Sequence, residues 1–268
     1  MKKPKFYCCA DVGSFKEKAK RIWGLEEYNS EQDKNELVLF FGLYADKDYE
    51  IIQEHKGKKI IFWCGTDVTS FLRNQYRQDI IKKYPEAEHY CENEVEGEEL
   101  RIFGLKPKVR PSFLEDINRF PVSYKQSDNP QVWVCGHHPK ENDDYGFNFI
   151  EGVAPKVPEI TFHLYGAEGD NKENVIYHGI VPREQFNQEI RKYQCGLRCN
   201  IHDGFSEVLM KSLLLGQYPI SRIPYEKIWS YETEEQLIEL LLKLKTMKAA
   251  NTEAMKFWIK KVNNYPWK

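Results

Sequence analysis

The stretch CGLRCNIHDGFSEVLMKSLLLGQYPIS, residues 195–221, decides the fold of this chain. A short β-prone run ends at the HDGFS turn (202–206), and apolar residues then recur at helical spacing as far as Leu213. A glycine-containing turn that leads into a helix directs backbone N–H groups and the positive end of the helix dipole towards one point. Such a point binds anions, most often phosphate. The alternative is that Asp203 or Ser206 only caps a core helix.

The order of side chains in this stretch resembles the donor-binding segment of GT-B fold glycosyltransferases. The likeness is to the retaining, nucleotide-sugar-dependent group (glycosyltransferase family 4-like), in which an arginine precedes HDG-x-S and E-A-x-x-x-G follows. Arg198, the HDGFS turn and Gly216 carry the match. The resemblance covers most of residues 130–225 and is traceable at 58–72, with a first domain that is short for the family. It implies two Rossmann-like parallel-sheet lobes that face each other across a cleft.

Strand-like and helix-like segments alternate along the chain, which independently predicts an α/β fold. Short apolar runs rich in aromatic and branched residues, such as ELVLFFGLY and KKIIFWCG, are typical of buried parallel strands. The run TSFLRNQYRQDIIKKYP (69–85) reads as one helix that stops at its proline. Prolines and polar residues gather between Leu114 and Pro130, which indicates a linker. We therefore expect an acceptor-side domain over 1–125 and a donor-binding domain over 126–268, whose last helix can pack back on the first lobe.

Composition indicates a soluble, cytoplasmic protein. The 268 residues are 41% hydrophobic, carry a net charge of −2, and contain no apolar run long enough to cross a membrane. The seven cysteines are scattered and odd in number, which favours reduced thiols over a disulfide framework. Cys195 and Cys199 lack a second pair at metal-ligand spacing, so no metal site is expected. The near-neutral charge argues against a general nucleic-acid binder.

The resemblance implies that the leaving diphosphate is held by cationic side chains and a helix N-terminus, without a metal or other cofactor. The expected donor and diphosphate contacts are His138, Lys140, Arg198, His202, Gly204, Phe205, Ser206 and Lys211. Two alternatives stay open. Lys140 can be a solvated loop lysine, and Arg198 can pair with a nearby carboxylate instead of a phosphate.

Two further groups of residues follow from the resemblance. NVIYHGIVPREQF (174–186) is similar to the family segment N-V-x-x-x-G-x-V, so His178, Gly179 and Val181 are candidate contacts of the nucleotide base. KKIIFWCGTDVTSFL (58–72) resembles the family turn H-G-S/T-D, which places Asp67 beside the acceptor or the sugar. Asp67 and Asp203 are therefore the candidate catalytic residues. A helix cap at Thr66 or Asp67 explains the second segment equally well.

Lys211 is the main departure from the family pattern. The family has paired carboxylates eight positions apart, of which the first contacts the donor sugar and the second the ribose. This chain still has a carboxylate, Asp203, at the first of these positions. The second position is occupied by Lys211, which cannot accept hydrogen bonds from ribose hydroxyls. Lys211 then either meets a phosphate oxygen or pairs with Glu207 on an exposed helix face.

The predicted function is transfer of a sugar from a UDP- or GDP-linked donor to a hydroxyl acceptor. The resemblance implies that the transfer retains the configuration at the anomeric carbon. The acceptor can be a polysaccharide or a glycolipid, in a protein of viral or bacterial origin. It can also be a hydroxylated DNA base, since small virus-encoded transferases of this fold modify DNA. The oligomeric state does not follow from the sequence. The alternative is a non-catalytic protein that binds a nucleotide sugar or sugar phosphate. A Rossmann dehydrogenase is disfavoured because no strand-to-helix turn carries Gly-x-Gly-x-x-Gly.

Overall fold

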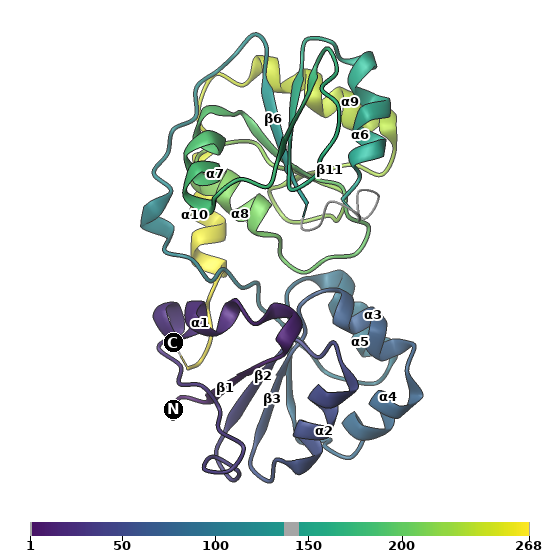
Figure 1. Ribbon diagram of the computed structural model, residues 1–268, viewed down its shortest axis with the longest axis vertical. Coiled ribbons are helices and arrows are strands. Elements are labelled where there is room, and N and C mark those ends of the chain that lie inside the picture. The colour runs from purple at the N-terminus through teal and green to yellow at the C-terminus, as the bar shows by residue number, and fades with distance from the viewer. Residues whose placement is uncertain (1, 137–144, 268) are drawn as a thin grey trace. The chain divides into compact units, whose positions relative to one another are not determined.

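The computed structural model describes residues 2–136 and 145–267, which form two parallel β-sheets with helices packed on them (Figure 1). Its residues divide into two compact units. Unit 1 comprises Met1–Asp116, His202–Phe205 and Lys260–Lys268, and unit 2 comprises Ile117–Ile201 and Ser206–Ile259. The predicted α/β class with two parallel sheets is confirmed. The boundary between residues 125 and 126 stays a prediction.

The sheet of unit 1 has the strand order β1-β2-β3-β4-β5, with all neighbours parallel. Its strands are β1 (Lys5–Cys8), β2 (Val38–Phe41), β3 (Lys59–Phe62), β4 (Glu88–Cys91) and β5 (Lys108–Val109). Its helices are α1 (Phe15–Trp23), α2 (Asp46–Glu54), α3 (Thr66–Leu72), α4 (Gln75–Ile81) and α5 (Glu94–Ile102). Strands β2 and β3 are buried along their whole length, as their continuous apolar sequences predict.

Helices cover both faces of this sheet. Side chains of α2, α3, α4 and α5 form one core with the sheet, and these helices lie together on one side of it in Figure 1. Trp23 of α1 packs on the opposite face, where it meets Tyr265 near the end of the chain. The C-terminal residues therefore complete the core of unit 1.

The single helix predicted over residues 69–85 is wrong, because the structure has two helices there. Asn74 lies between α3 and α4, and its side chain accepts a hydrogen bond from the Arg77 N–H at 3.3 Å. This contact satisfies a donor that a helix start otherwise leaves open. Asn74 therefore acts as the cap of α4.

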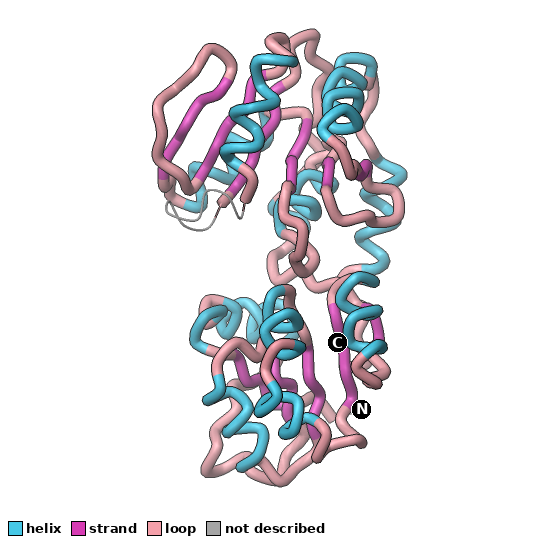
Figure 2. The backbone as a smooth tube through the Cα atoms, turned by 90° about the vertical axis from the view of Figure 1, so that its right-hand side faces the viewer, coloured by secondary structure: helices cyan, strands magenta, loops and turns pink. Residues whose placement is uncertain are grey.

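The sheet of unit 2 has the order β11-β10-β9-β6-β7-β8, again parallel throughout. Figure 2 draws the strands in magenta. Its strands are β6 (Gln131–Cys135), β7 (Thr161–Tyr165), β8 (Val175–Gly179), β9 (Cys195–Arg198), β10 (Ile220–Ser221) and β11 (Trp229–Ser230). Its helices are α6 (Phe147–Val153), α7 (Arg183–Glu189), α8 (Glu207–Leu214), α9 (Glu234–Lys243) and α10 (Thr252–Lys261), of which α10 ends in unit 1.

The strand order of unit 2 reverses at one point. The chain runs from β6 outward through β7 to β8, and then returns to place β9 on the other side of β6. The connections that leave the neighbouring strands β6 and β9 at their carboxyl ends, to β7 and to β10, therefore run in opposite directions. Open parallel sheets bind their ligands at such a reversal. No comparable reversal occurs in the consecutive order of the unit 1 sheet.

Candidate functional site

Arg198 lies at the strand-order reversal of unit 2. It is the last residue of β9, and Cys135 is the last residue of the neighbouring β6. The Arg198 Nη1 donates a hydrogen bond to the Cys135 carbonyl at 3.2 Å, and the guanidinium lies 4.8 Å from the ring centroid of Tyr145. These contacts hold a cation at the sheet edge where a ligand is expected. Its role as a phosphate contact stays a prediction.

Lys211 lies inside unit 2, on α8. Its side chain is only 4% exposed, so the alternative that placed it on an exposed helix face is wrong. Its Nζ lies 3.3 Å from Glu207 Oε2, one helical turn earlier, which confirms that part of the alternative. The same Nζ lies 5.6 and 5.5 Å from the ring centroids of Phe120 and Phe186.

Arg198 and Lys211 both affect the pKa of the Cys135 thiol. Burial raises the pKa of the Cys135 thiol, while Arg198 and Lys211 both oppose this effect and Glu207 adds to it. Both cations therefore lie within electrostatic reach of the carboxyl end of β6. Arg198 is fixed at the strand-order reversal, and Lys211 adds positive charge that its pair with Glu207 partly neutralises, so this environment favours an anionic ligand.

Ser206 caps α8. Its Oγ accepts a hydrogen bond from the Val208 N–H at 3.2 Å, which confirms the capping alternative for this residue. The Asp203 Oδ1 accepts the Gly204 N–H at 3.0 Å in the same turn. These N–H groups are bonded within the chain, whereas the sequence analysis expected them to be free.

The first part of the HDGFS turn belongs to unit 1 and is bonded there. The Phe205 N–H donates to Glu92 Oε2 at 2.9 Å. His202 Nε2 lies 2.9 Å from Glu99 Oε2, so these two side chains form a hydrogen bond. Glu92 and Glu99 stand at the carboxyl end of β4 and on α5 respectively. A protein carboxyl group thus bonds an N–H that was expected to meet phosphate.

Two glycines allow this close approach. Gly65, after β3, has φ +118°, and a Cβ there would lie 2.9 Å from the Gly204 nitrogen. A Cβ on Gly204 would lie 2.0 Å from Glu92 Oε2. Nearby, the Asn93 Nδ2 donates to the Asp203 carbonyl at 2.7 Å. The loops after β3 and β4 therefore fix the position of residues 202–205 within unit 1.

Asp67 is fully buried and bonded to backbone. Its Oδ1 accepts the N–H groups of Cys64 and Val68 at 2.9 and 3.0 Å, and its Oδ2 accepts the Leu43 N–H at 3.2 Å. Burial raises the pKa of Asp67 to about 7, against the effect of these donors. The contacts join the loops after β2 and β3, which favours the local structural alternative. A catalytic role for Asp67 stays a prediction.

Two buried carboxyl groups beside this turn, those of Glu92 and Glu96, were not predicted. Burial raises the pKa of Glu92 to about 8 and that of Glu96 well above its ordinary value. Glu92 is further bonded by the hydroxyl and N–H of Ser112. The signal was present as a capping box, in which Asn93 and Glu96 bond each other's backbone N–H groups. A pattern of this kind predicts the helix start but not the burial.

These pKa shifts predict that stability falls as pH rises. Asp67 and Glu92 keep their protons in the folded state at pH values where the unfolded chain has lost them. Their contribution is complete below about pH 4 and is lost as pH rises through about 7 and 8, at up to about 1.4 kcal/mol per pH unit for each group. Thermal unfolding followed by calorimetry should give a lower Tm at pH 8.5 than at pH 5.

Glu92→Gln tests the cause of this pH dependence. Glutamine cannot lose a proton, so the decrease of Tm between pH 5 and pH 8.5 should become smaller in this variant. Glu98→Gln, on the exposed side of α5, is the matched control and should keep the wild-type slope. Equal slopes in the two variants would contradict the assignment.

His178, a candidate base contact, belongs to a cluster of stacked rings in unit 2. Its ring lies 4.3 Å from that of Tyr165 at an interplanar angle of 7°, and its Nε2 lies 2.9 Å from His163 Nδ1. Burial lowers the pKa of His163 to about 4, so this imidazole is neutral at pH 7. Gly179 follows with φ +63° at the end of β8. The contact of His178, Gly179 and Val181 with a base stays a prediction.

Two predicted contacts, His138 and Lys140, lie outside the described residues. Within residues 2–136 and 145–267, no three or more His, Cys, Asp or Glu side chains are grouped so that they could hold a metal ion. In the same part of the chain, every helix is too short or too polar to span a bilayer.

No family model matches this chain, and no curated protein matches it significantly. Among solved structures, it is similar to the pneumococcal O-GlcNAc transferase GtfA in complex with UDP and GlcNAc. The identity is 14% and the TM-score 0.57, over 84% of this chain and 54% of that one. S. aureus TarM, in a complex that contains UDP, gives 14% identity and a TM-score of 0.60 over 84% and 52%.

The lipopolysaccharide outer core galactosyltransferase WaaB, in its apo form, is also similar. It gives 14% identity and a TM-score of 0.62 over 94% of this chain and 78% of that one. The chain has the GT-B type of fold. It spans about half the length of the GtfA and TarM chains.

Proposed function

We propose that this chain is a glycosyltransferase that moves a sugar from a UDP- or GDP-linked donor to a hydroxyl acceptor. The observation that carries the proposal is the pair of cations, Arg198 and Lys211, near the carboxyl end of β6 where the strand order reverses. A diphosphate gains negative charge as the glycosidic bond breaks, and fixed cations stabilise that charge in the transition state. The reaction is proposed to proceed with retention and without a bound metal, as the family resemblance implies.

The similar structures support a nucleotide-sugar donor. The GtfA and TarM structures contain UDP, and WaaB is named a galactosyltransferase. Asp203 is the proposed contact of the donor sugar, and Asp67 is proposed to act on the acceptor side. A glycan, a glycolipid and a hydroxylated DNA base all remain candidate acceptors. A cytoplasmic location is part of the proposal, since all seven cysteines are free thiols.

A second candidate function is non-catalytic binding of a nucleotide sugar or sugar phosphate. Lys211 favours it, because this residue stands where the family has a carboxylate that binds ribose. The chain is also about half as long as GtfA and TarM. Slow hydrolysis of a donor sugar by the purified protein would support the enzyme, and binding without hydrolysis would support the second function.

A thermal-shift panel of UDP, GDP, ADP, CMP and TDP tests the proposed ligand class. Selective binding raises the free energy of unfolding by RT ln(1 + [L]/Kd), which is about 2.7 kcal/mol at one hundred times Kd. We expect UDP or GDP to raise the Tm more than the other nucleotides and more than inorganic phosphate. A Tm unchanged by every nucleotide at millimolar concentration would contradict both functions.

A further inference from the structure

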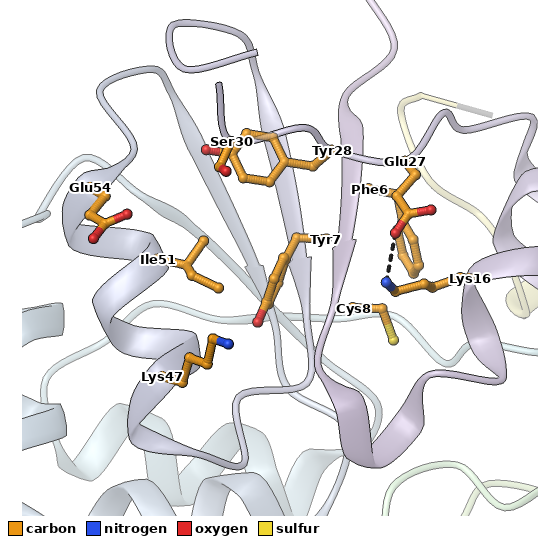
Figure 3. A pocket seen from close by; sticks show the side chains of 10 residues that line it. All are labelled: Phe6, Tyr7, Cys8, Lys16, Glu27, Tyr28, Ser30, Lys47, Ile51 and Glu54. Carbon is orange, nitrogen blue, oxygen red and sulfur yellow. Dashed lines mark hydrogen bonds and ion pairs between the residues drawn. The ribbon is translucent and has the colours of Figure 1, made fainter. Parts of the chain in front are cut away.

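A pocket of about 310 Å³ in unit 1 is lined by residues of β1, α1, α2 and the segment that follows α1 (Figure 3). One edge of β1 pairs with β2. On the other edge, the Phe6 N–H donates to the Glu26 carbonyl at 2.7 Å, and the Phe6 carbonyl accepts the Tyr28 N–H at 3.0 Å. This pairing ends at Tyr28, and beyond it Cys8 lines the pocket together with residues of α1 and α2. The pocket is therefore separate from the strand-order reversal of unit 2.

Two tyrosine rings form a rigid corner of the pocket. The rings of Tyr7 and Tyr28 lie 6.5 Å apart at an interplanar angle of 78°. The Tyr7 hydroxyl donates to Asp48 Oδ1 at 2.6 Å, and the Tyr28 hydroxyl lies 3.3 Å from His55 Nδ1. Both residues line the pocket, and because their hydroxyls are already bonded, their ring carbons are what remains for a ligand to contact. Such surfaces pack against the C–H groups of another molecule.

The polar groups of the pocket balance in charge. Lys16 is neutralised by Glu27, whose Oε1 lies 2.6 Å from its Nζ (Figure 3). Within the described part of the chain, the side chains of Ser30, Lys47 and Glu54 have no hydrogen-bond or ion-pair partner. They offer a hydroxyl, an ammonium donor and a carboxylate acceptor. The two lysines and two glutamates of the lining give no net charge, so a strongly anionic or cationic ligand gains little here.

We propose that this pocket binds a neutral sugar residue. A pyranose presents C–H groups on its faces, which fit the aromatic corner, and hydroxyls on its rim, which both donate to Glu54 and accept from Lys47. The pocket volume lies within the range of small-ligand sites. An apolar ligand would leave Ser30, Lys47 and Glu54 without partners. The inference does not depend on the proposed transfer reaction or on a nucleotide.

Saturation-transfer NMR of the full chain with glucose, galactose, N-acetylglucosamine, maltose and lactose tests this site. At least one of these sugars should bind with a dissociation constant on the order of 1–10 mM, typical of a small ligand with about 12 non-hydrogen atoms. Glu54→Gln and Lys47→Met alter exposed side chains and should leave the fold intact. Each should weaken binding about fivefold or more, because a charged hydrogen bond is lost.

Matched controls separate this site from general effects. Glu50→Gln, also exposed on α2, and Lys56→Met, just after this helix, should bind the sugar as the wild type does. The Arg198→Ala variant should also keep sugar binding, which distinguishes this pocket from the proposed donor site. No signal from any of the sugars at 50 mM, or equal binding in the Glu54→Gln and Glu50→Gln variants, would overturn the proposal.

Discussion

Arg198→Ala is expected to weaken nucleotide-diphosphate binding by about 30- to 1,000-fold, while unit 2 stays folded. Loss of a charged contact in a partly desolvated site costs about 2–4 kcal/mol, which corresponds to this range. Arg198 is not part of the apolar core of unit 2, and its contacts include a hydrogen bond to the Cys135 carbonyl and a ring contact to Tyr145, so its removal leaves that core in place. Isothermal titration with the best nucleotide from the thermal-shift panel measures the effect.

Arg119→Ala is the matched control for this substitution. Arg119 also lies in unit 2, but it is partly exposed and pairs with Glu184 at 2.5 Å. This variant should keep wild-type affinity, since surface ion pairs contribute little. Wild-type affinity in a folded Arg198→Ala protein would remove Arg198 from the site and leave it as a structural residue.

Lys211→Glu is expected to destabilise unit 2 by about 3–5 kcal/mol. The new carboxylate would stand in a position that is 4% exposed, one turn from Glu207 and beside the rings of Phe120 and Phe186. A buried charge without an opposite partner carries a cost of this size, and the repulsion from Glu207 adds to it. Denaturant unfolding, followed by circular dichroism, gives the change in free energy of unfolding.

Lys211→Met separates binding from stability. Methionine keeps much of the volume and the apolar contacts, so this variant should fold and should bind the diphosphate about tenfold less tightly. Lys192→Glu, an exposed charge reversal in the same unit, should change the free energy of unfolding by less than about 0.5 kcal/mol. Wild-type nucleotide affinity in Lys211→Met would show that Lys211 serves packing and its pair with Glu207 only.

Much of the fold was predictable because the spacing of apolar residues along the sequence indicates which faces of helices and strands are buried. The apolar runs that form β2 and β3 and the helix after the HDGFS turn were read correctly for this reason. The break at Asn74 was missed because it depends on one side-chain cap within a segment of uniform helical pattern. The membership of residues 202–205 and 260–268 in unit 1 depends on contacts far apart in the sequence, which local patterns do not contain.

The candidate site was predictable in its residue types but not in its bonding. Arg198 was found because an arginine within an apolar stretch needs a partner, and the structure places it at the strand-order reversal. The N–H groups of Gly204 and Phe205 were expected to be free, yet Asp203 and Glu92 accept them. Glu92 comes from another strand, 113 positions earlier, so no spacing within the turn could predict it.

One measurement tests the central claim, that the cations of unit 2 hold the diphosphate of a sugar donor for chemistry. The anomeric proton of a UDP- or GDP-linked sugar can be followed by NMR while the full chain is incubated with the donor that its nucleotide preference selects. The account predicts release of free sugar and nucleoside diphosphate by the wild type, at a rate at least about 30-fold lower in Arg198→Ala. Equal rates in the wild type and in a folded Arg198→Ala protein, or no release and no binding of any donor, would contradict it.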